Sequence, residues 1–377
     1  MRVVNVGLLG LGTVGQAVVQ LNRDFNHVRF EMQRALVKNP RRPRQVGIPL
    51  TTDPADILDD PAIDVVVEVT GGREPARQWI LQALQNGKAV VTANKEVLAY
   101  HGPELLAASR EWDTYLGFEA SVGGGIPILD ALKYHLTAAP IEDVFGVVNG
   151  TTNYLINAMA GGEPFGDALR RAQRLGFAEA DPGADIEGHD AVRKTVILAY
   201  LAYGQWLHPD EVPVKGLDDW PPQLFARLNQ AGFALRLLAW VRQSSQGAIQ
   251  AQVQPTIVPV HHWAARLQAA QNGVGARTKA GLFWMEGPGA GGLPTATSIW
   301  ADIRRSLTVR HPIMMDDAPI VSGGIERIPT PYLAIAQDPD RRLTAHHFQP
   351  LSDPSMALLD GPLADAEGLF QFPFWKD

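Results

Sequence analysis

Residues 3–15 read Val-Val-Asn-Val-Gly-Leu-Leu-Gly-Leu-Gly-Thr-Val-Gly, an apolar run that ends in a glycine-rich turn. The apolar part, 3–9, has the length and composition of a buried parallel strand. A helical pattern begins directly after the turn, at Gln16. A GxGxxG pattern between a strand and a helix is typical of dinucleotide binding, because the glycines let a pyrophosphate approach the helix N-terminus. The pattern predicts cofactor contacts at Gly10, Gly12, Thr13, Val14 and Gly15, with a ligand-free turn as the alternative.

Strands and helices alternate along the next hundred residues. Apolar runs predict further strands at 34–37, 64–69, 89–92 and 115–118, with a helix at 74–86. This alternation indicates a parallel sheet with right-handed crossovers, which is the α/β Rossmann-like class. Ligands bind at the carboxyl ends of such strands. Here those ends carry Thr70, Gly71, Asn94 and Lys95.

The second strand ends in a basic segment. NAD binders usually place a carboxylate there for the ribose 2′-hydroxyl, whereas this chain continues Lys38-Asn-Pro-Arg-Arg-Pro-Arg44. Because cations suit a 2′-phosphate, Lys38 and Arg41 predict a preference for NADP(H) over NAD(H). A solvated basic loop is the alternative. A nucleic-acid patch is disfavoured, since the run is short and lacks interleaved aromatic residues.

Composition limits the remaining classes of protein. A chain of 377 residues exceeds the usual range of a single core, so two or more domains are expected. The net charge of −7 argues against nucleic-acid or membrane partners, and the lack of cysteine excludes disulfides and a cysteine nucleophile. The sequence contains no signal-peptide pattern and no apolar run of about 18–20 residues, so we expect a cytoplasmic protein.

A second informative segment, 179–194, reads Glu-Ala-Asp-Pro-Gly-Ala-Asp-Ile-Glu-Gly-His-Asp-Ala-Val-Arg-Lys. Asp190 and Lys194 stand four residues apart where a helical pattern begins, so their side chains share one helix face. Asp185 follows a Pro-Gly turn and is predicted to cap that helix. A carboxylate beside a lysine can orient it, keep it charged or relay a proton. A solvated surface ion pair is the alternative.

The middle of the chain suggests a smaller α+β domain. Residues 150–205 predict three helices, the second ended by Gly176, and strands are predicted at 231–242, 248–258 and 277–286. A helix at 294–307 with Pro294 in its first turn then returns to the nucleotide-binding domain. We expect a nucleotide-binding domain at 1–128 and 294–309, a substrate and dimerisation domain at 129–293, and a short atypical extension at 310–377.

Several motifs in series resemble those of homoserine dehydrogenase. They occur in the family's order over roughly residues 3–307, at Gly7–Gly15, Val67–Gly72, Val91–Glu96, Phe118–Pro127, Asn149–Tyr154, 179–194 and Gly287–Thr297. The resemblance implies NAD(P)-dependent interconversion of L-homoserine and L-aspartate 4-semialdehyde, on the route to threonine, methionine and isoleucine. It also implies a homodimer built on the middle sheet.

The resemblance further implies the roles of individual residues. Lys194 matches the family's catalytic lysine, Asp190 its partner, and Lys95 a second active-site lysine beside the nicotinamide. Glu179 and Asp185 match the acidic residues that hold the substrate's ammonium group. Gly150 and Thr151 match the contacts on its carboxylate side. Gly289 lies in a loop that resembles a second surface near the cofactor. These residue types fit a zwitterionic substrate and a hydride transfer that needs an acid or a base. Lys194 is the first candidate to transfer the proton.

Two further features are expected from the resemblance. In the related enzymes the loop 118–127 binds sodium through backbone carbonyls, which here would belong to Glu119, Val122, Gly124 and Ile126. A tight connection to the next helix is the alternative. Many relatives carry a C-terminal ACT domain that binds a feedback amino acid. The tail lacks the usual Asp-Pro-Gly turn of that domain, although 332–335 suggests one strand and the aromatic terminus is expected to pack against the body or a partner.

Two rival functions remain open at this point. One is a dehydrogenase of another small amino acid; aspartate-semialdehyde dehydrogenase is disfavoured because its chemistry needs a cysteine. The other is an NADP-sensing regulator that keeps the fold without catalysis, against which the intact Lys95, Asp190 and Lys194 argue.

Overall fold

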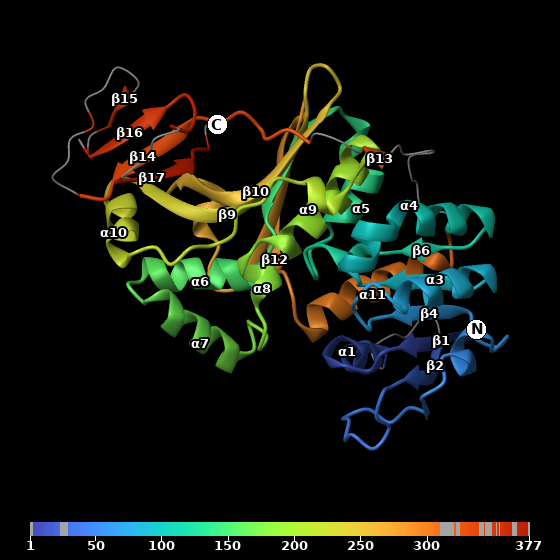
Figure 1. The fold of residues 1–377 in the computed structure, drawn as a ribbon. Coiled ribbons are helices and arrows are strands. Elements are labelled where there is room, and N and C mark those ends of the chain that lie inside the picture. Colours follow the sequence, from blue (N-terminus) through green and yellow to red (C-terminus); the bar gives the residue numbers. More distant parts are fainter. Residues whose placement is uncertain are drawn as a thin grey trace. The chain divides into compact units, whose positions relative to one another are not determined.

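The computed structural model describes residues 3–22, 29–309, 320–321, 325–338, 343, 349–351, 353, 355–363 and 368–375. The chain divides into two compact units. Unit 1 comprises Met1–Val144, Arg193–Glu211 and Val274–Gly323, and unit 2 comprises Phe145–Val192, Val212–Gly273 and Gly324–Asp377. The elements of both units are labelled in Figure 1.

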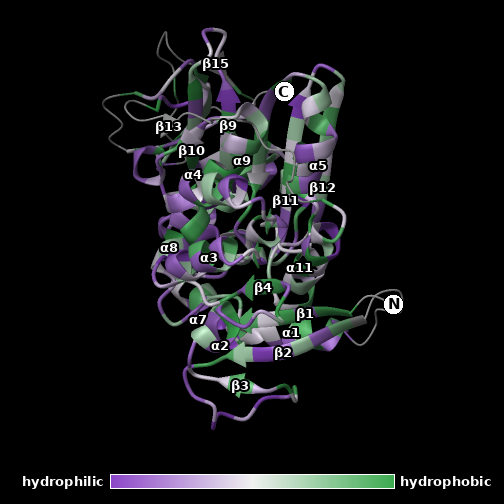
Figure 2. Cartoon of the chain, turned by 90° about the vertical axis from the view of Figure 1, so that its right-hand side faces the viewer, coloured by the Kyte–Doolittle hydropathy of each residue, from purple (hydrophilic) through white to green (hydrophobic). Residues whose placement is uncertain are grey.

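Unit 1 contains a six-stranded parallel sheet with the order β3-β2-β1-β4-β5-β6. The strands are β1 (Val3–Leu9), β2 (Arg29–Leu36), β3 (Leu50–Thr51), β4 (Val65–Glu68), β5 (Ala89–Thr92) and β6 (Leu116–Gly117). Chain order reverses at β1, which creates the switch point where such sheets bind ligands. The predicted Rossmann-like class is therefore confirmed, and β1 and β4 appear as the apolar strands of Figure 2.

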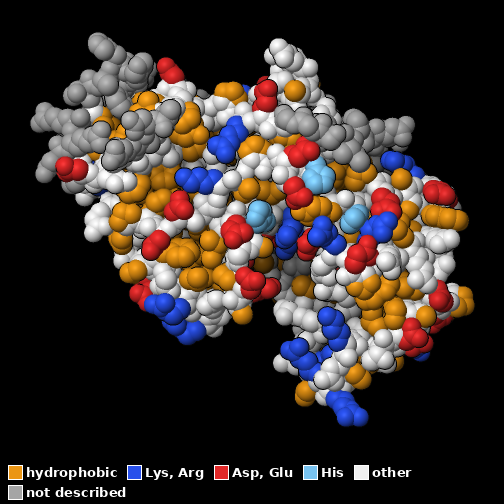
Figure 3. All heavy atoms as spheres, viewed as in Figure 1, with side chains coloured by type: hydrophobic (Ala, Val, Ile, Leu, Met, Phe, Trp, Pro, Cys, Tyr) orange, Lys and Arg blue, Asp and Glu red, His pale blue; other side chains and the backbone are white. Residues whose placement is uncertain are grey.

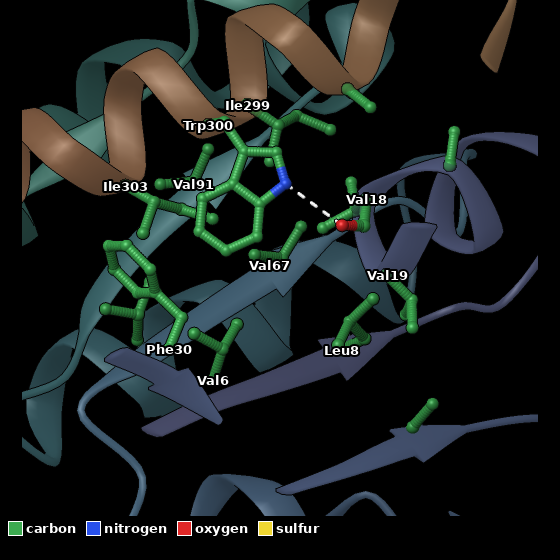
Figure 4. Close-up of a cluster of buried hydrophobic side chains, with 14 of the residues drawn as sticks. Val6, Leu8, Val18, Val19, Phe30, Val67, Val91, Ile299, Trp300 and Ile303 are labelled. Carbon is green, nitrogen blue, oxygen red and sulfur yellow. Dashed lines mark hydrogen bonds between the residues drawn. The ribbon is translucent and has the colours of Figure 1, made fainter. Parts of the chain in front are cut away.

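The helices of this sheet are α1 (Thr13–Leu21), α2 (Ala55–Leu58), α3 (Ala76–Gln85), α4 (Lys95–Glu111), α5 (Ile128–Tyr134) and α11 (Gly292–Ser306). The expected return of the chain near residue 294 is confirmed by α11, which packs on α1. The Trp300 indole N–H donates to the Val18 carbonyl at 2.9 Å, and its ring meets Phe30 edge-on at 4.8 Å (Figure 4). Pro294 lies in the first turn of α11, as predicted.

A five-stranded sheet has the order β10-β9-β7-β11-β12. Its strands are β7 (Ile141–Val147), β9 (Phe233–Gln243), β10 (Ile249–Pro259), β11 (Gln271–Thr278) and β12 (Gly281–Pro288). The prediction of one strand at 277–286 was wrong, because a turn at Lys279-Ala280 divides that range between β11 and β12. The Thr278 hydroxyl holds this turn by accepting from the Ala280 N–H at 3.1 Å and donating to the Gly281 carbonyl at 3.2 Å.

The helices predicted for 150–205 begin in unit 2, with one addition. They are α6 (Gly150–Ala160), α7 (Phe165–Leu175), the short α8 (Gly183–Ile186) and α9 (His189–Tyr203), which continues into unit 1. Gly176 ends α7 in the left-handed conformation at φ 77°, as predicted. Unit 2 further contains α10 (Pro222–Gln230) and the 3-10 helix η5 (Trp263–Arg266). Unit 1 further contains the paired strands β8 (Trp206–Leu207) and β13 (Ile320–Val321) and the 3-10 helices η2 (Glu119–Ser121), η3 (Leu136–Ala138) and η4 (Pro209–Glu211). None of the helices in the described ranges is both long and apolar enough to cross a membrane.

The C-terminal strands form an antiparallel sheet of their own with the order β15-β16-β14-β17. They are β14 (Tyr332–Ala336), which confirms the predicted strand at 332–335, β15 (Gln349–Pro350), β16 (Met356–Leu359) and β17 (Leu369–Pro373). Beyond β17, Trp375 is 1% exposed and its backbone N–H donates to the Ile257 carbonyl at 2.9 Å. Its ring centroid lies 4.3 Å from that of Trp240 and 4.8 Å from that of Phe145, so the aromatic terminus does pack against the rest of unit 2.

We expect Trp375→Ala to destabilise unit 2 by about 3–5 kcal/mol, because it empties a buried aromatic cluster. The midpoint of urea denaturation measures this loss. Trp112→Ala is the matched control, since Trp112 is 44% exposed and its removal should cost less than about 0.5 kcal/mol. Equal midpoints for the two variants would show that the terminus contributes no stability.

Candidate active site

The glycine-rich turn before α1 is tightly packed on one side and open on the other. A Cβ at Gly15 would lie 2.4 Å from the Gly10 carbonyl oxygen, and Gly10 has φ +104° with the Val69 carbonyl oxygen 2.9 Å from its own Cβ position. A Cβ at Gly12 would meet nothing within 4 Å. The open face at Gly12 is where a pyrophosphate can reach the N–H groups of the first turn of α1, which includes Thr13 and Val14.

A cavity of ≈ 630 Å³ lies beside this turn, between α1, the loop after β2 and the start of α11. It is lined by Thr13, Gln16, Ala17, Gln20, Pro43, Arg44, Gln45, Gly292 and Leu293. A cavity of this size suits a small-molecule ligand or cofactor.

The basic loop after β2 contains two kinds of cation. Arg44 is half-buried and donates to the carbonyls of Asn39 at 3.1 Å and Arg42 at 2.9 Å, so it holds the loop's own backbone. Lys38 and Arg41 are exposed. Lys and Arg side chains gather at the foot of the space-filling view, where this loop lies (Figure 3). Lys38 and Arg41 are thus available to an anionic ligand.

The turns after β4 and β5 carry the next group of predicted residues. Asn94 caps α4, since its Oδ1 accepts from the Val97 N–H at 3.1 Å, and its Nδ2 donates to the Gly72 carbonyl at 2.7 Å. The amide therefore links the Thr70-Gly71-Gly72 turn to the start of α4. Lys95 is the first residue of α4 and is half-buried.

An ion pair ties this first turn of α4 to α9. The Glu96 carboxylate lies 3.5 Å from Arg193 Nη2 and 3.9 Å from Arg73 Nε. Glu96 follows Lys95 and Arg193 precedes Lys194, so the pair joins the two chain segments that carry the predicted lysines.

The loop 118–127 is held by α11. Asp302 is fully buried; its Oδ2 accepts from the Glu119 N–H and its Oδ1 from the Tyr115 hydroxyl, both at 2.8 Å. The Ser298 hydroxyl donates to the Gly124 carbonyl at 2.6 Å. Burial raises the pKa of the Asp302 and Glu119 carboxyl groups. Sequence analysis missed Asp302 and Ser298, which lie about 180 residues from the loop they hold.

The same loop touches the predicted cofactor residue Gly289. A Cβ at Gly124, which has φ +59°, would lie 2.7 Å from the Gly289 carbonyl carbon. The two glycine-rich loops therefore approach each other by backbone alone, which explains the need for glycine at 124.

Unit 2 brings together two of the predicted acidic residues through an amide that sequence analysis missed. Asn149 is 4% exposed; its Nδ2 donates to Asp185 Oδ1 at 2.6 Å and to Asp190 Oδ2 at 2.8 Å. Its Oδ1 accepts from the Thr152 N–H at 2.8 Å and caps α6. A lone asparagine before Gly-Thr-Thr signals a helix cap, but nothing local in the sequence indicates the two carboxylates.

The prediction that Asp185 caps α9 was wrong. Asp185 lies inside α8, and α9 begins three residues after α8 ends. The Pro-Gly turn starts a separate helical turn, so the Asp185 carboxylate turns toward Asn149 instead. Glu179 is exposed and lies outside this hydrogen-bonded group.

The remaining substrate positions lie at the start of α6. A Cβ at Gly150 would be 2.6 Å from the Ala270 carbonyl oxygen, so only glycine fits there. The Thr151 hydroxyl donates to the Phe177 carbonyl at 2.6 Å, which leaves the backbone N–H groups of this turn as its contribution to a ligand.

Asp190 and Lys194 lie one helical turn apart on α9, as predicted. Asp190 is 4% exposed and Lys194 is 7% exposed. The alternative of a solvated surface ion pair is therefore wrong. Burying a carboxylate and an ammonium group costs free energy that a structural helix face does not require.

Comparisons with known proteins show which sequences and structures this chain is similar to. The family model "Homoserine dehydrogenase, NAD binding domain" matches residues 10–119, and "Homoserine dehydrogenase" matches 127–303. The homoserine dehydrogenase of Bacillus subtilis is 40% identical over 315 residues, which cover 80% of this chain and 72% of that protein. The solved homoserine dehydrogenase of Thiobacillus denitrificans is similar with a TM-score of 0.86 and 31% identity over 99% of this chain and 98% of that one. A hyperthermophilic archaeal homoserine dehydrogenase in complex with NADPH is similar with a TM-score of 0.70 and 25% identity, over 81% of this chain and 98% of that one.

We expect Asn149→Ser to lower turnover about tenfold or more and to lose less stability than Asn149→Ala. Serine can still cap α6 but cannot donate to both carboxylates. Asn149→Ala should lose the cap as well, at a cost of about 1 kcal/mol of stability. Thermal melting and initial rates measure the two effects. An Asn149→Ser enzyme with unchanged turnover would show that the bridge between Asp185 and Asp190 has no role in the reaction.

Proposed function

This chain belongs to the homoserine dehydrogenase family, and we propose that its buried residues Lys194 and Asp190, with Asp185, carry the interconversion of L-homoserine and L-aspartate 4-semialdehyde. The activity is that of an oxidoreductase with an NAD-binding domain. The observation that carries the proposal is the bridge from Asn149 to two carboxylates, the half-buried Asp185 and the buried Asp190, which lies a helical turn from a buried lysine.

Lys194 is the proposed proton carrier. A bound nicotinamide cofactor supplies or takes the hydride. When the aldehyde is reduced, its oxygen becomes an alkoxide, and the Lys194 ammonium group gives it a proton; in the reverse direction the neutral amine takes that proton from the homoserine hydroxyl. Asp190 orients Lys194 and favours its charged form. Lys95 is the second proposed catalytic residue and stabilises charge beside the nicotinamide.

The amino-acid end of the substrate requires both signs of charge. Asp185 and Glu179 are proposed to meet its ammonium group, with Asp185 aligned by Asn149. The N-terminus of α6, at Gly150 and Thr151, is proposed to meet its carboxylate, since the first N–H groups of a helix point outward and attract anions.

The proposed cofactor is NADP(H) rather than NAD(H), because Lys38 and Arg41 are exposed cations after β2. Its pyrophosphate would lie at Gly10, Gly12, Thr13, Val14 and Gly15. Thr70, Gly71, Asn94 and Lys95 would contact the nicotinamide side, with Gly289 as a further surface. A neighbour solved with NADPH is consistent with this preference.

Four carbonyls of the loop 118–127 are proposed to hold a structural sodium ion, at Glu119, Val122, Gly124 and Ile126. Neutral oxygen donors fit a hard cation. The Gly124 oxygen already accepts from Ser298 and the Ile126 oxygen from the Ile128 N–H, and each keeps a second lone pair. The ion would brace the loop and take no part in the hydride step.

The larger organisation is also a proposal. We infer a nucleotide-binding domain at 1–128 and 294–309, a substrate and dimerisation domain at 129–293, and an extension at 310–377. A homodimer is supported by β12, an edge strand that exposes Leu282 and Phe283. We further propose a cytoplasmic enzyme of threonine, methionine and isoleucine biosynthesis. Its net charge of −7 argues against nucleic-acid and membrane partners.

We expect Lys194→Ala to lower kcat by about 10²–10⁴-fold with little change in NADPH affinity, because a general acid is lost. Lys95→Ala should lose both turnover and cofactor affinity. The oxidation of NADPH with aspartate semialdehyde, and the reduction of NADP with homoserine, are followed by absorbance. Lys215→Ala is the matched control and should keep full activity. Lys215 is exposed, and its Nζ lies 3.8 Å from the exposed Asp218 carboxylate.

Failure of the wild-type protein in both directions, alongside tight NADPH binding, would favour the NADP-sensing regulator. Full turnover of Lys194→Ala would assign the proton step to another group.

The paired substitution Lys38→Ala and Arg41→Ala is expected to weaken NADPH binding about ten- to a hundredfold, because charge-assisted contacts to the 2′-phosphate are lost. NADH binding should change little. Fluorescence titration with both cofactors measures the ratio, and Arg110→Ala, at an exposed residue of α4, is the control. A proportional loss for both cofactors would mean that the loop does not read the phosphate.

A further inference from the structure

Glu68 is a fully buried carboxylate at the end of β4, with 0% exposure. Three neutral groups donate to it. Its Oε1 accepts from the Thr70 N–H at 2.8 Å and from the Thr70 hydroxyl at 2.6 Å, and its Oε2 accepts from the Thr92 hydroxyl at 2.7 Å. A buried charge costs several kcal/mol unless it is fully hydrogen-bonded, so a residue of this kind needs a reason.

These bonds are part of a closed ring across two neighbouring strands. Glu68 and Thr92 are register partners in β4 and β5. The Thr92 Oγ1 also accepts from the Asn94 N–H at 3.0 Å, and the Asn94 side chain returns to the Gly72 carbonyl at 2.7 Å. From Gly72 the chain itself leads back through Gly71 to Thr70. The ring therefore fixes both turns that leave the carboxyl edge of the sheet.

Of the two turns so held, the one after β4 is open toward solvent. Gly71 and Gly72 have φ +76° and +77°, and a Cβ at either would meet nothing within 4 Å. The ring thus lies beneath a surface that presents Thr70 and Gly71, next to the buried Asn94 and the half-buried Lys95. A pair of apolar residues would stabilise this interior position as well as the carboxylate does, whereas only hydrogen bonds fix the direction of both turns.

We propose that Glu68 is a positioning residue for the cofactor, acting through Thr70, Thr92 and Asn94 to hold the two turns in the conformation that binds the nicotinamide end. The inference rests on the proposed function, because it takes those turns to be the cofactor site. It predicts that Glu68 matters for cofactor affinity more than for stability or for homoserine binding.

Both carboxylate oxygens act as acceptors, which distinguishes two substitutions. Glu68→Gln keeps the acceptor for the fixed Thr70 N–H if its amide nitrogen faces Thr92, whose hydroxyl can rotate. Glu68→Ala leaves the Thr70 N–H without its acceptor. NADPH affinity should fall about tenfold or more in Glu68→Ala and about threefold or less in Glu68→Gln. The KM for homoserine should stay within about twofold of wild type in both.

Fluorescence titration with NADPH gives affinity without turnover, and steady-state rates with homoserine separate KM from kcat. Ser109→Ala is the matched control: Ser109 lies in α4, is 2% exposed and donates to the Thr114 carbonyl at 2.6 Å, so it loses one buried bond away from the turns. Should Glu68→Ala fail to fold, Thr92→Val breaks the same ring and Thr92→Ser restores its hydroxyl. Cofactor affinity should fall in the first and recover in the second.

NADPH affinity equal to wild type in Glu68→Ala or Thr92→Val would overturn the inference, as would an equal loss in Ser109→Ala. Those outcomes leave the proposed function standing. A wild-type protein that neither binds NADPH nor oxidises homoserine would instead reject the proposed function itself.

Discussion

The Trp300 indole N–H donates to the carbonyl of Val18 across 282 residues of sequence, and the helix that makes this bond organises most of unit 1. From α11, Ser298 and Asp302 bond to the backbone of the loop 118–127. A Cβ at Gly292, where α11 begins, would lie 3.0 Å from the Thr13 carbonyl oxygen. One helix therefore supports the glycine-rich turn before α1, the sheet core and the loop 118–127 together, so a shift of α11 would disturb all three.

Three buried polar side chains share one feature. Asn149, Glu68 and Asp302 are each nearly or fully buried, and each joins backbone or side chains from separate segments. Their hydrogen bonds have direction, which apolar packing lacks, and the low dielectric around them strengthens each bond. The protein accepts the cost of burying these groups where the chain must hold a fixed shape without the support of a regular helix or strand.

The sequence was most informative where the signal was local. The glycine turn, the β/α alternation and the i,i+4 pair Asp190 and Lys194 depend on neighbouring residues, and each was confirmed as local structure. The Lys279-Ala280 turn was missed because neither residue is a strong turn former. The predicted capping role of Asp185 was wrong, because Asp185 lies in the separate helix α8 and accepts a hydrogen bond from Asn149, 36 residues earlier. Asn149, Asp302 and Glu68 gain their roles from segments brought together only by folding.

The discontinuity of unit 1 has a consequence for synthesis on the ribosome. The strands β1 to β6 emerge within the first 117 residues, but Ile299, Trp300 and Ile303, which are nearly fully buried against them, are made much later. Until then one apolar flank of the sheet has α1 on it but lacks α11, while the whole of the β9–β10 hairpin is translated in between. Such long-range closure slows folding and leaves nascent chains prone to aggregate. This architecture should therefore make production of the enzyme sensitive to translation speed and to chaperones that shield exposed sheet surfaces.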